Sequence, residues 1–269
     1  MKESACRFGE HGQLAGVITE PVGTAPRAAF VLVSAGLTPK FGPFRLYAQL
    51  ARRLAAEGVL TLRFDLGGIG DSGQGYGGHP LKKRTELEIK AAVDFLSESR
   101  EVEAVVLGGL CSGAEDSFRY AEHDARVAGV VLIDAFGYKT AGWRFRDLAI
   151  RAARRALWAL GLLSIDAPAG GRALIDYKPM DHPEARRILR ALIGRKVAMH
   201  FVYTGGMRES FNHKGQFKAM FDGIEFQGLV SLDYFPQLRH TQALEADRRA
   251  VIEAITSRVT AVEGVLCRD

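Results

Sequence analysis

Cysteine is scarce in this sequence, and long apolar runs are absent. The 269 residues include three cysteines, Cys6, Cys111 and Cys267, an odd number spread over the whole length. Small secreted domains instead carry a dense, even set of cysteines. The longest apolar run, Ala156 to Ile165, is far shorter than the roughly 20 residues that a membrane-spanning helix requires. The first residues also lack the apolar core of a signal peptide, so we expect free thiols and a cytoplasmic location.

Charge of one sign dominates only one segment. The chain holds 36 Lys and Arg against 31 Asp and Glu, and 47% of its residues are hydrophobic, as is typical of a folded, water-soluble protein. Residues 139–196 alone hold thirteen Lys and Arg against five Asp and Glu. Since the rest of the chain is slightly acidic, the basic character belongs to this segment.

Short β-branched runs alternate with longer helical patterns from residue 28 onward. This alternation predicts strand–helix crossovers, an α/β fold and a largely parallel sheet. Two earlier runs, Ala5–Phe8 and Leu14–Thr19, predict an antiparallel hairpin at the sheet edge. The other strands are expected at Ala28–Ser34, Val59–Phe64, Val102–Gly109, Val127–Asp134, Val197–Thr204 and Leu229–Tyr234. Helices are expected at Pro43–Glu57, Thr85–Arg100, Ser112–His123, around Gln216–Phe221 and at Ala243–Arg258.

A long segment interrupts this alternation. About sixty residues separate the expected strand ending at Asp134 from the one starting at Val197, far more than one crossover needs. Trp143–Leu163 within it is rich in arginine and has a helical pattern. We therefore predict a helical cap insertion at residues 138–196, between two parts of one core at residues 1–137 and 197–269.

An apolar, strand-like run leads through glycines straight into a helix around Cys111. A nucleophile elbow has this layout, because its sharp turn leaves room only for small residues two positions before and two after the nucleophile. Gly109 and Gly113 flank Cys111 in this way, whereas Leu110 would crowd Ser112 in the same role. The spacing favours Cys111 as the nucleophile, at a helix N-terminus that stabilises a thiolate. A buried cysteine without reactivity is the alternative.

This elbow resembles that of the α/β-hydrolase superfamily, and the resemblance extends over nearly the whole chain. Arg63–Ser72 resembles the turn after the fourth strand, and Val31–Leu37 resembles the oxyanion loop, with Ala35 where the usual histidine stands. A cysteine in place of the common serine is similar to dienelactone hydrolases and to hydrolases of exosortase gene clusters. The resemblance implies an α/β-hydrolase fold, with a mostly parallel eight-stranded sheet flanked by helices and a helical cap insertion.

The resemblance also implies a set of site residues. The backbone amides of Leu37 and Ser112 would form the oxyanion hole, and His240, which follows the last expected strand, would be the general base. The acid would follow the preceding strand, where Glu209 is the only carboxylate of its loop. Asp134 is the alternative acid, because some members carry it one strand earlier. We favour Glu209, and a solvated surface role is the alternative for each of these three side chains.

Gly68–Gly73 matches the G-x-G-x-x-G spacing of a dinucleotide-binding loop. Such a loop requires a helix to begin inside it, but the residues that follow, Gln74 to Pro80, are too rich in glycine for a helix. No Cys/His spacing indicates a metal site, and no Walker-type loop is present in the sequence. We therefore expect neither a cofactor nor a metal.

Cys111, His240 and a carboxylate predict an acyl-transfer enzyme that hydrolyses an ester or thioester through a cysteine acyl-enzyme. A transferase or cyclising release enzyme with a non-water acceptor, and a non-catalytic binding protein on the same scaffold, are the alternatives. For the basic segment we favour an acidic acyl-carrier protein or an anionic acyl substrate over a membrane surface, and we expect no nucleic acid. A merely solvated face is the remaining alternative.

The elbow spacing generates the first prediction. We expect iodoacetamide to alkylate Cys111 faster than Cys6 or Cys267, and an acyl donor to label Cys111 rather than Ser112, as measured by peptide mass spectrometry. Cys111→Ser should fold but lose much of its rate, since a hydroxyl needs more help from a base than a thiol does. Labelling of Ser112, or full activity of Cys111→Ala, would contradict the assignment.

Overall fold

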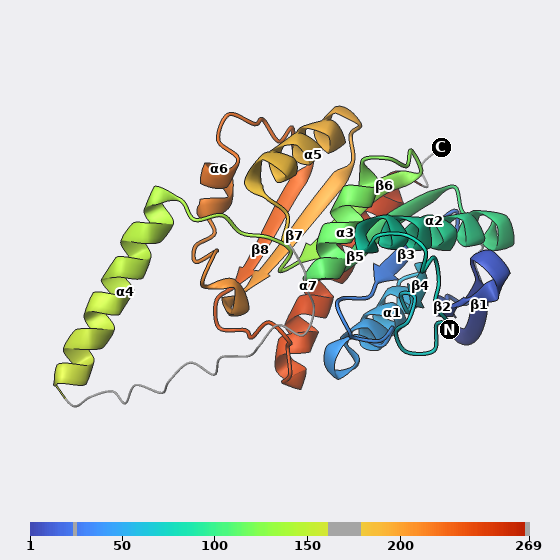
Figure 1. Ribbon diagram of the computed structural model, residues 1–269, viewed down its shortest axis with the longest axis horizontal. Coiled ribbons are helices and arrows are strands. Elements are labelled where there is room, and N and C mark those ends of the chain that lie inside the picture. The colour runs from blue at the N-terminus through green and yellow to red at the C-terminus, as the bar shows by residue number, and fades with distance from the viewer. Residues whose placement is uncertain (24–25, 161–178, 267–269) are drawn as a thin grey trace.

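The computed structural model describes residues 1–23, 26–160 and 179–266. Eight strands form one sheet that lies between two layers of helices (Figure 1). The strand order is β1-β2-β4-β3-β5-β6-β7-β8. The pairs β1–β2 and β2–β4 are antiparallel, and the other five pairs are parallel. The predicted α/β class, the mostly parallel eight-stranded sheet and the N-terminal edge hairpin are confirmed.

Each expected strand is present, with ends that differ by a few residues. The strands are β1 (Lys2–Phe8), β2 (Leu14–Glu20), β3 (Ala28–Val33), β4 (Leu60–Phe64), β5 (Ala104–Leu110), β6 (Val127–Ile133), β7 (Ala198–Thr204) and β8 (Val230–Phe235). The central strands β3 and β4 are buried along their full lengths, which accounts for the unbroken apolar sequence of β3.

The helices form two layers, one on each face of the sheet. On one face, α1 (Leu46–Ala56) and α7 (Glu245–Leu266) pack together over buried side chains such as Leu50 and Val251. The other face is covered by α2 (Leu81–Arg100), α3 (Ser112–Ala121), α5 (His182–Gly194) and α6 (Gln216–Met220). Each layer therefore closes its own apolar core against the sheet.

The parallel register brings the carboxyl ends of the strands to one edge. Leu110 at the end of β5 pairs with Ile133 at the end of β6, and Ile133 pairs with Val202 near the end of β7. The residues that follow these strands therefore lie next to one another, although they are far apart in the sequence.

The segment predicted as a cap contains two quite different helices. α5 lies against the sheet, and its Ile188, Leu189 and Leu192 are fully buried in the core, so it is the crossover helix between β6 and β7 rather than part of a cap. α4 (Ala141–Ala159) instead stands away from the sheet (Figure 1), and residues 148–160 are exposed. Residues 161–178 of the predicted insertion lie outside the described residues, and its boundaries stay a prediction.

Within the three described ranges, no helix combines the length and the apolar character that spanning a bilayer requires.

The position of α5 generates the second prediction. Leu189→Ala should lower the free energy of unfolding by about 2–5 kcal/mol, because it leaves a cavity beneath the helix. Arg190→Ala is the matched control: its side chain is exposed one residue further along, and the change should stay within about 0.5 kcal/mol. Urea unfolding measures both. Equal effects would show that α5 does not pack on the sheet.

Candidate active site

Cys111 occupies the sharp turn between β5 and α3. Its backbone angles are φ 53° and ψ −119°, a region that residues with a side chain rarely adopt. Such a conformation costs roughly 1–3 kcal/mol and persists only where the surroundings enforce it. The turn projects the cysteine from the carboxyl edge of the sheet.

The two flanking glycines are required by close backbone packing. A Cβ on Gly109 would lie 2.8 Å from the carbonyl oxygen of Val33, and one on Gly113 would lie 2.8 Å from that of Ser34. Both distances are shorter than a real Cβ contact allows. The end of β3 therefore presses against both sides of the turn, which is the physical reason for the spacing seen in the sequence.

The loop after β3 is joined to the same turn. The Gly36 amide donates a hydrogen bond to the Ser112 hydroxyl at 2.9 Å, so Ser112 uses its side chain to hold this loop. Among the described residues, no oxygen accepts a hydrogen bond from the amide of Leu37 or of Ser112. These two amides, predicted to form the oxyanion hole, keep their donors free, and the Gly36–Ser112 hydrogen bond joins the loops that carry them.

His240 is held by Asp134. Its Nδ1 lies 2.8 Å from Asp134 Oδ2, and because a carboxylate only accepts, Nδ1 carries the proton. Asp134 follows β6 directly and is fully buried. Its two oxygens also accept from Thr204, Oδ1 from the amide at 2.7 Å and Oδ2 from the hydroxyl at 2.6 Å. The carboxylate is thus fixed from two sides.

This pairing corrects the preferred acid. We expected Glu209 to orient His240, but Glu209 is exposed, and the structure brings Asp134, the alternative, to the imidazole instead. The loop after β7 contributes close packing: a Cβ on Gly206 would lie 2.6 Å from the His240 amide nitrogen. Gly206 therefore admits the His240 loop, and the carboxylate comes from the neighbouring strand.

The imidazole of His240 is strongly basic. The pKa of His240 is raised to about 10, chiefly by the hydrogen bond with Asp134 and next by the side chain of Cys111. Burial acts in the opposite direction. Since Cys111 takes part in this shift, Cys111, His240 and Asp134 form one electrostatically coupled group.

Solved structures with the same fold cover nearly the whole chain. XC6422 from Xanthomonas campestris, described as an α/β serine hydrolase without lid, has a TM-score of 0.60 over 96% of this chain and 94% of its own, at 14% identity. The Pyrococcus furiosus esterase Pf2001 has a TM-score of 0.61 over 97% of this chain and 90% of its own, at 13% identity. Est1E from Butyrivibrio proteoclasticus gives 0.61 over 96% and 98%, at 16% identity. This chain has the α/β-hydrolase fold.

The fold predicted from the resemblance is therefore confirmed. No family model matches the sequence, and the comparison with curated proteins gives no match either. At these low identities the likeness shows the α/β-hydrolase fold alone, and the chemistry has to come from this chain's own residues.

Tyr47 is a supporting residue of this candidate site that the sequence analysis missed. Its hydroxyl donates to the Val33 carbonyl at 3.1 Å and accepts from the Leu110 amide at 2.7 Å, so it joins the ends of β3 and β5 directly before the turn. Its side chain is fully buried, and burial raises its pKa. A tyrosine in an apolar helix pattern gives no sequence signal for this role.

Asp65 explains the glycine-rich stretch after β4. This buried carboxylate accepts from the Lys40 amide at 2.5 Å, the Lys40 ammonium at 2.7 Å and the Asp71 amide at 3.0 Å. It thus ties the loop after β3 to Gly68–Gly73. The next helix begins only at Leu81, so no helix starts inside the G-x-G-x-x-G sequence, as predicted.

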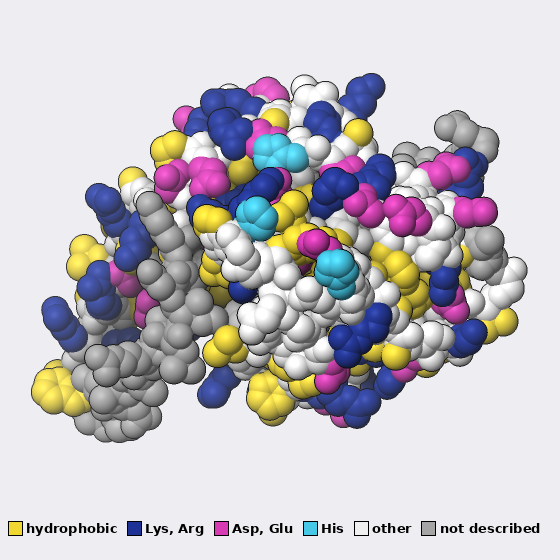
Figure 2. All heavy atoms as spheres, turned by 45° about the vertical axis from the view of Figure 1, so that its right-hand side comes forward, with side chains coloured by type: hydrophobic (Ala, Val, Ile, Leu, Met, Phe, Trp, Pro, Cys, Tyr) yellow, Lys and Arg dark blue, Asp and Glu magenta, His cyan; other side chains and the backbone are white. Residues whose placement is uncertain are grey.

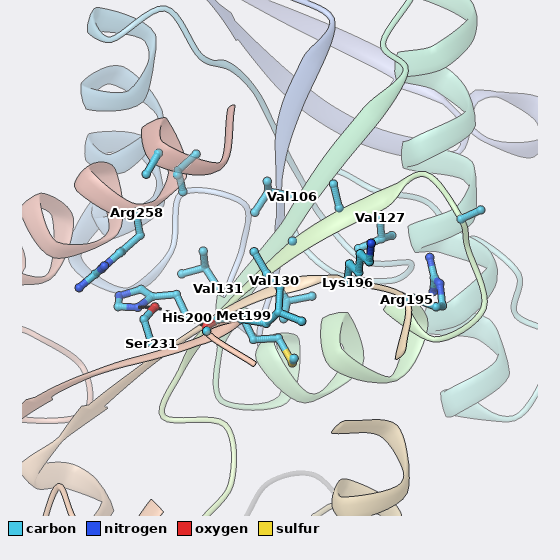
Figure 3. Close-up of a pocket in the computed structure, with 18 residues that line it drawn as sticks. Val106, Val127, Val130, Val131, Arg195, Lys196, Met199, His200, Ser231 and Arg258 are labelled. Carbon is cyan, nitrogen blue, oxygen red and sulfur yellow. Dashed lines mark hydrogen bonds between the residues drawn. The ribbon is translucent and has the colours of Figure 1, made fainter. Parts of the chain in front are cut away.

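Two cavities differ in their relation to the site. A cavity of about 380 Å³ lies beside His240 and is lined by Gly205, Gly206, Arg208, Pro236, Gln237, Leu238 and Arg239. A larger one of about 660 Å³ lies at the amino ends of β6 and β7, with His200 and Arg258 at one end and Arg195 and Lys196 at the other (Figure 3). Because Cys111 lies at the carboxyl ends of the strands, the larger cavity lies away from the candidate site. In the described parts of the chain, no cluster of three His, Cys, Asp or Glu side chains could hold a metal ion.

The coupled group generates the third prediction. In an NMR titration of His240, the pKa should be near 10 in the wild type, fall towards 6.5 in Asp134→Asn, and stay unchanged in the control Glu209→Gln. Asp134→Asn lowers the pKa because it removes the negative charge that stabilises the imidazolium. A fall in the pKa of His240 in Glu209→Gln instead would show that Glu209 is the carboxylate that orients His240.

The same shift makes folding stability depend on pH. A group whose pKa is raised in the folded state contributes its full stability below the unfolded value of 6.5, and loses it as the pH rises through about 10. The unfolding free energy should therefore fall between these pH values more in the wild type than in His240→Gln. If the unfolding free energies of the two proteins changed in parallel with pH, this prediction would be contradicted.

Proposed function

We propose that this protein is an acyl-transfer enzyme that hydrolyses an ester or thioester through an acyl-enzyme on Cys111. The observation that carries this proposal is the placement of Cys111 in the strained turn, with the His240–Asp134 pair coupled to it. A thiol held beside a basic imidazole and two free amides is a complete set of groups for attack on a carbonyl.

In the first half of the proposed reaction, Nε2 of His240 takes the proton of the Cys111 thiol, the sulfur attacks the carbonyl carbon, and the carbonyl oxygen becomes an oxyanion. The amides of Leu37 and Ser112 donate to this oxygen. Collapse of the tetrahedral intermediate breaks the bond to the leaving group, which takes a proton from Nε2 of His240. Asp134 keeps Nε2 directed at the site and stabilises the imidazolium, without itself accepting the proton.

In the second half, His240 takes a proton from water, and the resulting hydroxide attacks the thioester of the acyl-enzyme. The tetrahedral intermediate then expels the Cys111 sulfur and releases the free acid. A thioester intermediate is more reactive than an oxygen ester, so this step suits a cysteine enzyme.

The similar structures favour acyl transfer as the reaction class, since those proteins are described as serine hydrolases and esterases. The cysteine nucleophile is a property argued from this chain alone. The likeness to dienelactone hydrolases, which also rests on the cysteine elbow, stays a prediction.

The function generates the fourth prediction. Hydrolysis of p-nitrophenyl butyrate should be lost in Cys111→Ala and slowed by up to ~10⁴ in Asp134→Asn, as for other triads that lose the orienting carboxylate. The matched controls Cys6→Ala and Glu209→Gln should keep the wild-type rate within about twofold. Intact-protein mass spectrometry should show one acyl group on the wild type and none on Cys111→Ala. An inert wild type that still binds the ester would indicate a binding protein, and an acyl group found on a second acceptor instead of free acid would indicate a transferase.

A further inference from the structure

α4 exposes a continuous apolar face. Phe145, Leu148 and Leu160 are 75%, 65% and 71% exposed. On a helix these positions fall on one side, together with the alanines between them. We define the apolar face as Phe145, Leu148, Ala149, Ala152, Ala156 and Leu160. Single exposed apolar residues need no explanation, but a row of them along one helix marks a surface that something else covers.

Arginines run along one border of this face. Arg144, Arg151 and Arg155 repeat at helical spacing beside it, and we call them the arginine border. From Lys139 to Leu160 the chain holds six Lys and Arg and a single acidic residue, Asp147, which pairs with Arg151. Figure 2 shows the result, with dark blue and yellow side chains next to one another on the part of the molecule that α4 forms, at the left of the view.

Within the described residues, α4 is fastened to the body at its base. The indole of Trp143 donates to the Arg208 carbonyl at 3.1 Å, and Arg146 donates to the Asn212 side chain at 2.9 Å. Both partners belong to the loop after β7, whose Gly206 contacts His240. From this base the helix extends outward (Figure 1), and residues 148–160 are exposed.

We propose that α4 binds in the plane of an anionic phospholipid bilayer. Its apolar face would enter the acyl boundary, and the arginine border would reach the phosphate groups of the lipids. Only this partner matches both halves of the pattern. An acidic carrier protein would engage the arginines and leave the apolar face in water. A second copy would cover the apolar face but bring two arginine borders together.

The experiment is flotation of the full-length protein with vesicles. We expect binding to phosphatidylcholine vesicles that contain 30 mol% phosphatidylglycerol, weaker binding in 0.5 M NaCl, and little binding to pure phosphatidylcholine. Replacing Arg144, Arg151 and Arg155 by glutamine should weaken binding on the order of 100-fold. The control, Lys82→Gln, Lys83→Gln and Lys90→Gln on α2, removes the same charge from exposed positions and should change binding less than about threefold.

A second measurement tests the orientation of the helix. The chain has two tryptophans. Trp143 is buried, whereas Trp158 is exposed and lies on the far side of α4 from Phe145. Brominated lipids should quench a tryptophan placed by Phe145→Trp in a Trp158→Phe background, and should quench Trp158 of the wild type much less. Phe145→Ser with Leu148→Ser should weaken vesicle binding about 100-fold, and their exposure means that the melting temperature should not change.

Several results would overturn the proposal. They are absence of vesicle binding, an equal loss in the α2 control, or equal quenching at both tryptophan positions. Binding of an acidic carrier protein through the arginine border without vesicle binding would assign the surface to a protein partner. A dimer in solution that protects Phe145 from solvent would assign it to a second copy. None of these measurements uses the reaction at Cys111, so they are independent of the proposed function.

Discussion

The backbone of Cys111 is held in a conformation that a residue with a side chain avoids, and the rest of the site is arranged around that constraint. The end of β3 packs against Gly109 and Gly113, so neither position can carry a Cβ. Tyr47 joins the strands on both sides of this contact, and the Ser112 hydroxyl holds the following loop. The roughly 1–3 kcal/mol that such strain costs is offset by these surrounding interactions. Because the turn is fixed, the position of Cys111 relative to the amide of the next residue, Ser112, is fixed as well.

The sequence was most informative where a single local rule applied. Strand and helix periods predicted the layers, and the small residues around Cys111 predicted the turn, because sterics leave few alternatives there. The acid could not be found in this way. Asp134 and Glu209 both follow a parallel strand, and the choice between them depends on which oxygen reaches His240. That depends on the pairing of β6 with β7 and on Thr204, neither of which leaves a mark in the sequence.

The insertion shows how a correct observation led to an incomplete assignment. The segment that connects β6 to β7 is longer than one crossover needs, and its length alone predicts a single inserted unit. α5 nevertheless had ordinary start signals: Asp181 caps its first turn and Pro183 lies directly inside it. Its buried leucines make it part of the core, while α4 has the opposite pattern of exposure. The two helices therefore differ in burial, which the length of the segment could not reveal. Gly205 and Gly206 were similarly passed over, although paired glycines after a strand often mark close contact between backbones.

The hydrogen bonds of Asp134 have a consequence for the order of events. Thr204 and His240 together occupy both carboxylate oxygens, so the His240 ring is fixed with Nδ1 inward. Nε2 is then the only nitrogen through which protons can pass in the proposed reaction. The departing group and the incoming water must each meet that one atom, and they cannot do so together. In the proposed reaction the first product therefore leaves before the acceptor enters, a double-displacement sequence that the acyl-enzyme on Cys111 also requires.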